Sequence, residues 1–156
     1  MSAAESEAWL CLVAVLELLP ASLDAQLQRD AQLTHFEYVV LTLLRLEPGC
    51  ALQLKQVATR TNATLPRLSH VVSRLENRGL VERTPCRDDR RATNLRLTDA
   101  GRCAVIRATP PHIEHIRHAV FDGLDDHDLA ALARIAGTIR HRLDPPSGFH
   151  GENPAE

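Results

Sequence analysis

Residues 87–91 read RDDRR and are followed by the alternating segment TNLRL and then by TDAG. Arginine side chains bind phosphates and base edges, and Asp89, two positions before Arg91, can hold that guanidinium by a charge-assisted hydrogen bond. A charged loop of this kind is by itself most often a solvated turn. Its role therefore depends on the elements that position it.

The charges of the chain are unevenly distributed. The 156 residues include 18 basic and 20 acidic side chains, for a net charge of −2. Between Arg60 and Arg96, nine arginines stand against four acidic residues, so this block carries +5. The rest, with nine basic and sixteen acidic residues, carries −7. A basic block in an acidic chain indicates a surface for a polyanion such as nucleic acid.

Residues 54–75 have the pattern of a helix-turn-helix. Ala58 is small enough for two helices to cross closely, and Asn62 stands where the turn requires a left-handed backbone, which asparagine tolerates. Thr64 is a suitable cap for the second helix. The buried side of that helix is predicted to consist of Leu68, Val71 and Leu75.

The outward positions of this second helix could contact DNA. Arg67 suits a bidentate contact with guanine, and Leu65 or Pro66 suits a thymine methyl group. Hydroxyls and arginines suit phosphates. The predicted recognition residues are Thr64, Leu65, Pro66, Arg67, Ser69, His70 and Arg74. The same pattern also fits a pair of packed helices with an ordinary polar surface.

A predicted β-hairpin behind the helix-turn-helix favours the DNA-binding interpretation. Leu80–Arg83 and Thr93–Leu97 are strand candidates, joined by the charged run. Two helices followed by such a hairpin form a winged helix, whose wing lies near the minor groove, where the negative potential attracts arginine. The predicted wing residues are Arg87, Asp89, Arg90 and Arg91.

Further helices are expected on both sides of this unit. One covers residues 8–29, and another begins at a capping box formed by Thr34 and Glu37, with Leu33 and Tyr38 as a hydrophobic staple, and ends at Leu46. A short helix is expected over 53–61, and a longer one over 65–78. A helix capped by Thr98 should break or bend at Pro110 and Pro111, resume over 112–121, and be followed by a last helix capped by Asp125. Residues 144–156 are rich in Pro and Gly and are expected to be disordered.

The segment from residue 68 to residue 101 resembles the MarR family of winged-helix transcription regulators. The matching residues are Leu75, Glu76, Gly79, Leu80, Val81 and Arg83, then Asp89 and Arg91, then Leu97, Thr98 and Gly101. His70 stands where many members carry arginine, so a base preference does not transfer.

The resemblance implies a mainly α fold with a small β-hairpin wing. It implies one domain over 8–143, with a winged helix over about 34–98 and dimerisation helices over about 8–29 and 99–143. It further implies a homodimer that binds a pseudo-palindromic operator in double-stranded DNA. Repression is expected rather than activation, with a small aromatic effector as a further partner. An apolar helix surface too large for a monomer to hide supports the dimer: Leu12, Leu16, Leu19, Leu132, Ile135 and Ile139.

Other function classes find less support in the sequence. No apolar run reaches the ~18 residues of a membrane span, and no signal peptide is expected. Enzyme motifs are missing, so we expect no catalytic residues, no cofactor and no metal. The four cysteines, none in a Cys-x-x-Cys motif, indicate free thiols in a reducing cytoplasm: Cys11, Cys50, Cys86 and Cys103.

Three alternatives stay open. The winged helix could bind a protein partner, which would lack the steep salt dependence of DNA binding. Cys11 could sense oxidants, although its apolar neighbours predict burial and low reactivity. The repeated histidines His112, His115 and His118 are expected at the dimer interface, with metal binding as the weaker alternative.

Overall fold

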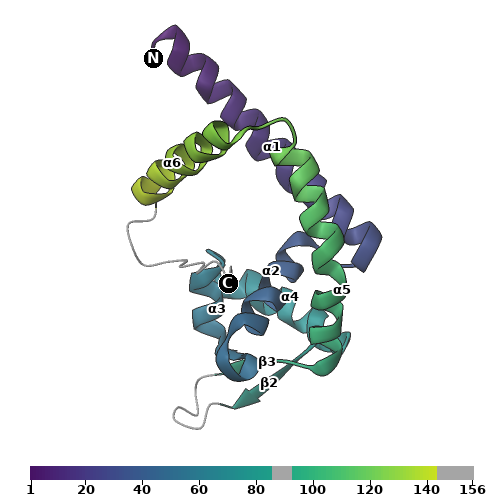
Figure 1. Cartoon of the computed structure of the whole chain (residues 1–156). Coiled ribbons are helices and arrows are strands. Elements are labelled where there is room, and N and C mark those ends of the chain that lie inside the picture. The colour runs from purple at the N-terminus through teal and green to yellow at the C-terminus, as the bar shows by residue number, and fades with distance from the viewer. Residues whose placement is uncertain (86–92, 144–156) are drawn as a thin grey trace.

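The computed structural model describes residues 1–85 and 93–143. Most of them lie in helices, and the three short strands form a single sheet (Figure 1). The elements in chain order are α1 (Ala3–Ala31), α2 (His35–Leu46), the 3₁₀ turn η1 (Pro48–Cys50), β1 (Ala51–Gln53), α3 (Leu54–Arg60), α4 (Leu65–Asn77), β2 (Val81–Pro85), β3 (Thr93–Leu97), α5 (Asp99–Ile116), the π-helical turn η2 (Arg117–Phe121) and α6 (Asp126–Leu143).

The sheet is antiparallel with the order β1-β3-β2. The predicted hairpin is confirmed, since Val81 pairs with Leu97 and Pro85 with Thr93. The third strand, β1, was not expected from the sequence. It has only three residues, too few for an alternating pattern, and it is held in the sheet by pairing with β3.

The core lies between α2, α3, α4 and the sheet, and the C-terminal end of α1 and one side of α5 close it. The predicted capping box of α2 is confirmed: Glu37 N donates to Thr34 Oγ1 at 3.1 Å, and Thr34 N donates to a Glu37 carboxylate oxygen at 2.8 Å. Leu33 and Tyr38 are both buried in this core. Thr98 and Asp125 also cap their helices as predicted.

The sequence predicted that the helix after Thr98 breaks or bends at its two prolines, but α5 does not break there. It is one helix from Asp99 to Ile116, although Pro110 and Pro111 each lack a backbone N–H. Both prolines are exposed, whereas Ala108 and His112 are buried. Because α5 packs along α1 (Figure 1), tertiary contacts on the opposite face maintain the helix through the two missing hydrogen bonds.

Helices α1 and α6 leave large apolar surfaces exposed in a single chain. The first helix begins at Ala3, earlier than expected, and continues through Pro20. Leu16 is 58% exposed. Helix α6 buries none of its residues, and its apolar positions Leu132, Ile135 and Ile139 are all exposed.

Helix α1 differs from the sequence expectations in two respects. By length and composition alone, Ala3–Ala31 is long and apolar enough to cross a membrane, although Glu17 and Asp24 interrupt its apolar run. Cys11 is exposed rather than buried, because the N-terminal half of α1 projects beyond the helices that pack on its C-terminal half (Figure 1).

Candidate nucleic-acid interface

The helix-turn-helix has the predicted local geometry. Ala58 is buried between α3 and α4, and Asn62 adopts a left-handed backbone with φ of 49°. Thr64 caps α4, since its hydroxyl accepts a hydrogen bond from the backbone N–H of Arg67 at 3.4 Å. The turn therefore sets the angle at which α4 leaves the core.

Helix α4 is clearly two-sided. Its buried face consists of Leu68, Val71, Val72 and Leu75. Ser69 is half-buried, and the other predicted recognition residues are exposed: Thr64, Leu65, Pro66, Arg67, His70 and Arg74. The first turns of α4 thus expose polar and cationic groups together with the apolar side chains of Leu65 and Pro66. Side chains of these kinds recognise base edges in a major groove.

Arg67 lies against an aromatic ring from a neighbouring helix. Its guanidinium carbon is 4.7 Å from the centre of the Phe36 ring, and Phe36 belongs to the first turn of α2. The contact was not foreseen, because 31 positions of sequence separate a cation and a ring with no local pattern linking them.

A buried carboxylate holds the arginines farther along α4. Glu37 is only 3% exposed; it accepts a hydrogen bond from Arg74 Nη2 at 2.8 Å and lies 3.6 Å from Arg78 Nη1. The capping role of Glu37 was predicted, but its pairing with α4 was not. One N–H of the Arg74 guanidinium is therefore engaged by Glu37, which leaves its other N–H donors for a phosphate.

Arg83 joins the wing to α4. Its guanidinium donates to Glu76 Oε2 at 2.7 Å, and to Ser69 O and Ser73 Oγ at 3.1 Å each. These contacts connect β2 with three successive turns of α4. Glu76 and Arg83 were noted in the sequence only as parts of a motif, without this role.

The predicted wing residues Arg87, Asp89, Arg90 and Arg91 lie outside the described residues. The strands that lead into the wing are described, and their pairing brings Pro85 and Thr93 opposite each other. Residues 86–92 therefore connect the ends of two adjacent strands.

The repeated histidines have three separate environments. His112 is 3% exposed inside the chain, so its expected place at a dimer interface is wrong; its Nδ1 donates to Gln26 Oε1 at 2.8 Å. His115 bonds to Ser22 and His118 to Asp122. Because successive three-residue steps rotate around the helix, the three rings do not converge on one point.

Burial sets the protonation of His112. Desolvation lowers its pKa, and the nearby His35 and His115 lower it further. Its ring is edge-on to Tyr38, with centroids 4.6 Å apart, and the Tyr38 hydroxyl bonds to Thr109. A lowered pKa favours the neutral form of His112, which lies at the junction of α1, α2 and α5.

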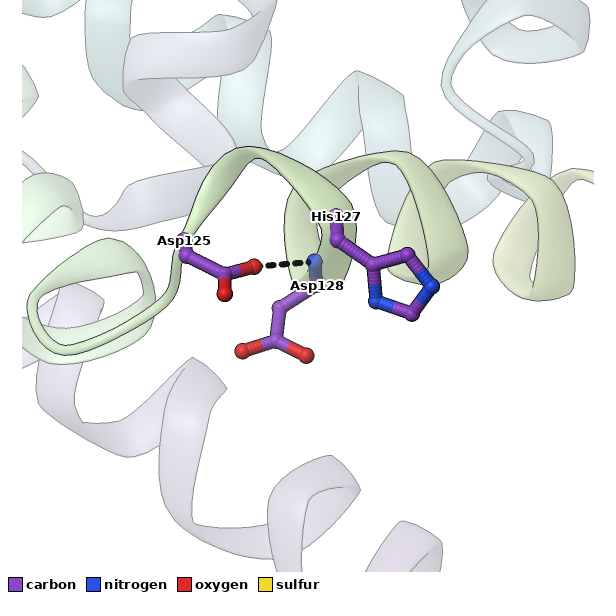
Figure 2. Close-up of side chains that lie close together, drawn as sticks. All are labelled: Asp125, His127 and Asp128. Atoms are coloured by element: carbon purple, nitrogen blue, oxygen red, sulfur yellow. Dashed lines mark hydrogen bonds between the residues drawn. The ribbon is translucent and has the colours of Figure 1, made fainter.

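A second group of possible metal ligands lies at the start of α6. Figure 2 shows Asp125, His127 and Asp128, whose ligand atoms lie within 4.8 Å of one another. The dashed line in Figure 2 is the 2.8 Å hydrogen bond from Asp128 N to Asp125 Oδ1, which caps the helix. All three residues are exposed, and helix capping accounts for the acidic side chains.

Several known proteins are similar to this chain in sequence and in fold. The family model described as MarR family matches residues 31–92. Sco3205, a MarR family transcriptional regulator from Streptomyces coelicolor whose structure was solved in complex with DNA, is 36% identical, with a TM-score of 0.89 over 94% of this chain and 95% of that one. AbsC, another MarR family regulator from the same organism, is 31% identical, with a TM-score of 0.86 over 92% and 96% of the two chains.

A more distant structure shows the same fold. CouR from Rhodococcus jostii RHA1, bound to p-coumaroyl-CoA, is 22% identical, with a TM-score of 0.77 over 93% of this chain and 97% of that one. The identity and coverage of the two Streptomyces proteins go further than a shared fold. The chain belongs to the MarR family of DNA-binding transcriptional regulators.

Proposed function

We propose that this regulator reads a specific DNA sequence with the first turns of α4. The observation that carries the proposal is the exposure of Leu65, Pro66, Arg67 and His70 on one helix whose opposite face is fully packed. The DNA complex of Sco3205, the 36% identical relative, supports DNA as the partner.

Within this surface we assign different roles to different residues. Arg67 contacts guanine, and Leu65 or Pro66 meets a thymine methyl group. Thr64, Ser69 and Arg74 contact phosphates, and Arg74 also keeps its hydrogen bond to Glu37. His70 faces the groove but donates differently in its neutral and charged forms.

We propose that the wing adds a minor-groove contact. Its sequence supplies Arg87, Arg90 and Arg91, while Asp89 orders the loop by holding Arg91. The attachment of β2 to α4 through Arg83 supports this role, because it fixes the base of the wing relative to the recognition helix.

We propose that the active species is a homodimer, built by α1, α5 and α6. Helix α6 buries none of its residues in a single chain, whereas helices in proteins owe most of their stability to the packing of an apolar face, so α6 needs a partner. An open apolar groove of about 500 Å³ also lies where α1, η2 and α6 meet; it is lined by Val15, Leu18, Leu19, Leu124 and Leu132, among others. In this division of labour, residues of about 34–98 bind DNA and the flanking helices dimerise.

The dimer also accounts for the hydropathy of α1. Its C-terminal part is anchored in the protein core through Leu23 and Leu27, so a partner chain, rather than a lipid bilayer, is proposed to cover the exposed apolar residues. We therefore place the protein in the cytoplasm. Catalysis forms no part of the proposal.

Repression and release by an effector complete the proposal. Binding of a dimer across a promoter blocks transcription, and a small aromatic molecule would release it. CouR was solved with p-coumaroyl-CoA, but at 22% identity that likeness supports the fold alone.

The test is selection of bound fragments from genomic DNA, followed by titration of the selected duplex. Arg67→Ala should reduce specific affinity by about 1–3 kcal/mol and relax the preference at one base position in each half-site. Unchanged base preference would remove Arg67 from the proposed readout. Affinity that does not fall steeply with salt would instead favour a protein partner.

The exposed thiol of Cys11 supports a second candidate function, release of DNA by oxidation. Operator affinity should then fall after treatment with peroxide and be insensitive to it in Cys11→Ser. Equal behaviour of the two proteins would eliminate this candidate.

A further inference from the structure

The contact between Phe36 and Arg67 differs in kind from the other arginine contacts of α4. Arg74 uses a guanidinium N–H to bond to Glu37. Arg67 instead lies over a ring, and in the described part of the chain its guanidinium donates no hydrogen bond. Cation–π attraction uses the positive charge and no N–H donor, so the donors of Arg67 remain available to a base edge.

Phe36 is a well-fixed platform. The capping box of Thr34 and Glu37 sets the backbone on either side of it, and its ring packs partly against the core. The base of Arg67 is fixed as well, because its backbone N–H bonds to Thr64. Both ends of a long side chain are therefore restrained before any ligand is bound.

Restraint of this kind matters for arginine. A free arginine side chain samples many rotamers, and ordering it on binding weakens the complex. A side chain that is already oriented loses less entropy, so its hydrogen bonds contribute more to affinity. The benefit is largest where geometry is demanding, as in a bidentate contact with guanine.

We propose that Phe36 positions Arg67 for base readout and is thereby a specificity-determining residue outside the recognition helix. The proposal rests on the proposed major-groove role of α4. Phe36 itself need not touch DNA; it acts through the orientation of the Arg67 guanidinium.

The test is a double-mutant cycle on the selected operator duplex. Phe36→Leu removes the ring and keeps an apolar side chain, while Phe36→Tyr keeps the ring and serves as the matched control. Each is made in the natural chain and in Arg67→Ala, and dissociation constants are measured by fluorescence anisotropy on the operator and on duplexes substituted at the base read by Arg67. Melting temperatures establish that all variants are folded under the assay conditions.

We expect Phe36→Leu to weaken operator binding by about five- to thirtyfold, the range for an exposed cation–π contact applied to each of two subunits. It should also reduce the preference at the base read by Arg67. Phe36→Tyr should stay within about twofold of the natural chain, and in Arg67→Ala the leucine substitution should have less than about a twofold effect.

Several outcomes would overturn the inference. An equal loss in the Arg67→Ala background would mean that Phe36 acts through the fold and not through Arg67. Tighter binding by Phe36→Leu would mean that the ring withholds Arg67 from DNA. If Arg67→Ala changes base preference and Phe36→Leu does not, only the positioning role fails; if Arg67→Ala leaves base preference unchanged, the proposed readout by Arg67 fails as well.

Discussion

Mild acidification should destabilise the folded protein through His112. The ring is buried, its Nδ1 donates to Gln26, and burial followed by the two neighbouring histidines lowers its pKa. The unfolded state therefore binds more protons than the folded state below the ordinary histidine pKa of 6.5. Stability is fully present above that pH and is lost as the pH falls through and below it.

The size of the effect follows from the unfolded chain. At about pH 5.5, a histidine with its ordinary pKa is about nine-tenths protonated. If native His112 stayed neutral, its titration in the unfolded state would lower the free energy of unfolding by about 1.4 kcal/mol between about pH 7.5 and pH 5.5. This is the upper limit for one group over that range. Burial also lowers the pKa of His35, against the opposing charge of Asp24, so His35 contributes in the same direction.

The charged groups around His112 do not reverse this sign. On α1, Asp24 accepts a hydrogen bond from the backbone N–H of His35, and Asp30 accepts one from Gln26. On α2 and α5 the titratable neighbours are Tyr38, His35 and His115. No carboxylate in the described residues hydrogen-bonds to the ring itself, so protonation gains no direct ion pair.

The assay is chemical denaturation at several pH values and one fixed protein concentration, because dimerisation would couple to unfolding. His112→Gln can keep the hydrogen bond to Gln26 but cannot titrate, so its stability should fall less between about pH 7.5 and 5.5. His118→Gln, at an exposed site paired with Asp122, is the control and should follow the natural chain. Stability that increases on acidification, or a pH slope unaffected by His112→Gln, would refute the reasoning.

Three further predictions concern the core, the dimer and the wing. Glu37→Gln keeps the cap acceptor but removes the charge next to Arg74 and Arg78. The free energy of unfolding should fall by about 1–2 kcal/mol, a figure already reduced for the partial exposure of the arginines. A change within experimental error would mean that the two ion pairs contribute no more to stability than contacts of the same groups with water. Ile135→Glu places a charge on the exposed apolar face of α6 and should shift sedimentation from a dimer to the 17.3 kDa chain, whereas a monomeric natural protein at micromolar concentration would refute the dimer. Arg91→Ala should weaken operator binding by about tenfold and flatten its salt dependence without changing the melting temperature, and Asp89→Ala should weaken binding in part, although simple electrostatics predicts tighter binding for that change.

The sequence alone determined the local elements of this protein. Capping at Thr34, Thr64, Thr98 and Asp125, the left-handed turn at Asn62 and the two faces of α4 were all predicted. Each depends on residues within a turn or two of one another, where hydrogen-bond geometry and helical periodicity leave few alternatives. The family motifs follow for the same reason, since they combine these local signals in a fixed order.

Only the tertiary structure decided which distant side chains meet. The contacts of Phe36 with Arg67 and of Glu37 with Arg74, the burial of His112 and the pairing of β1 with β3 all join segments with no local relation. Packing of α5 on α1 likewise outweighed the helix-breaking tendency of Pro110 and Pro111. Local propensities are worth a few kcal/mol at most and can be exceeded by the burial of a helix face, which depends on neighbours that are far away in the sequence.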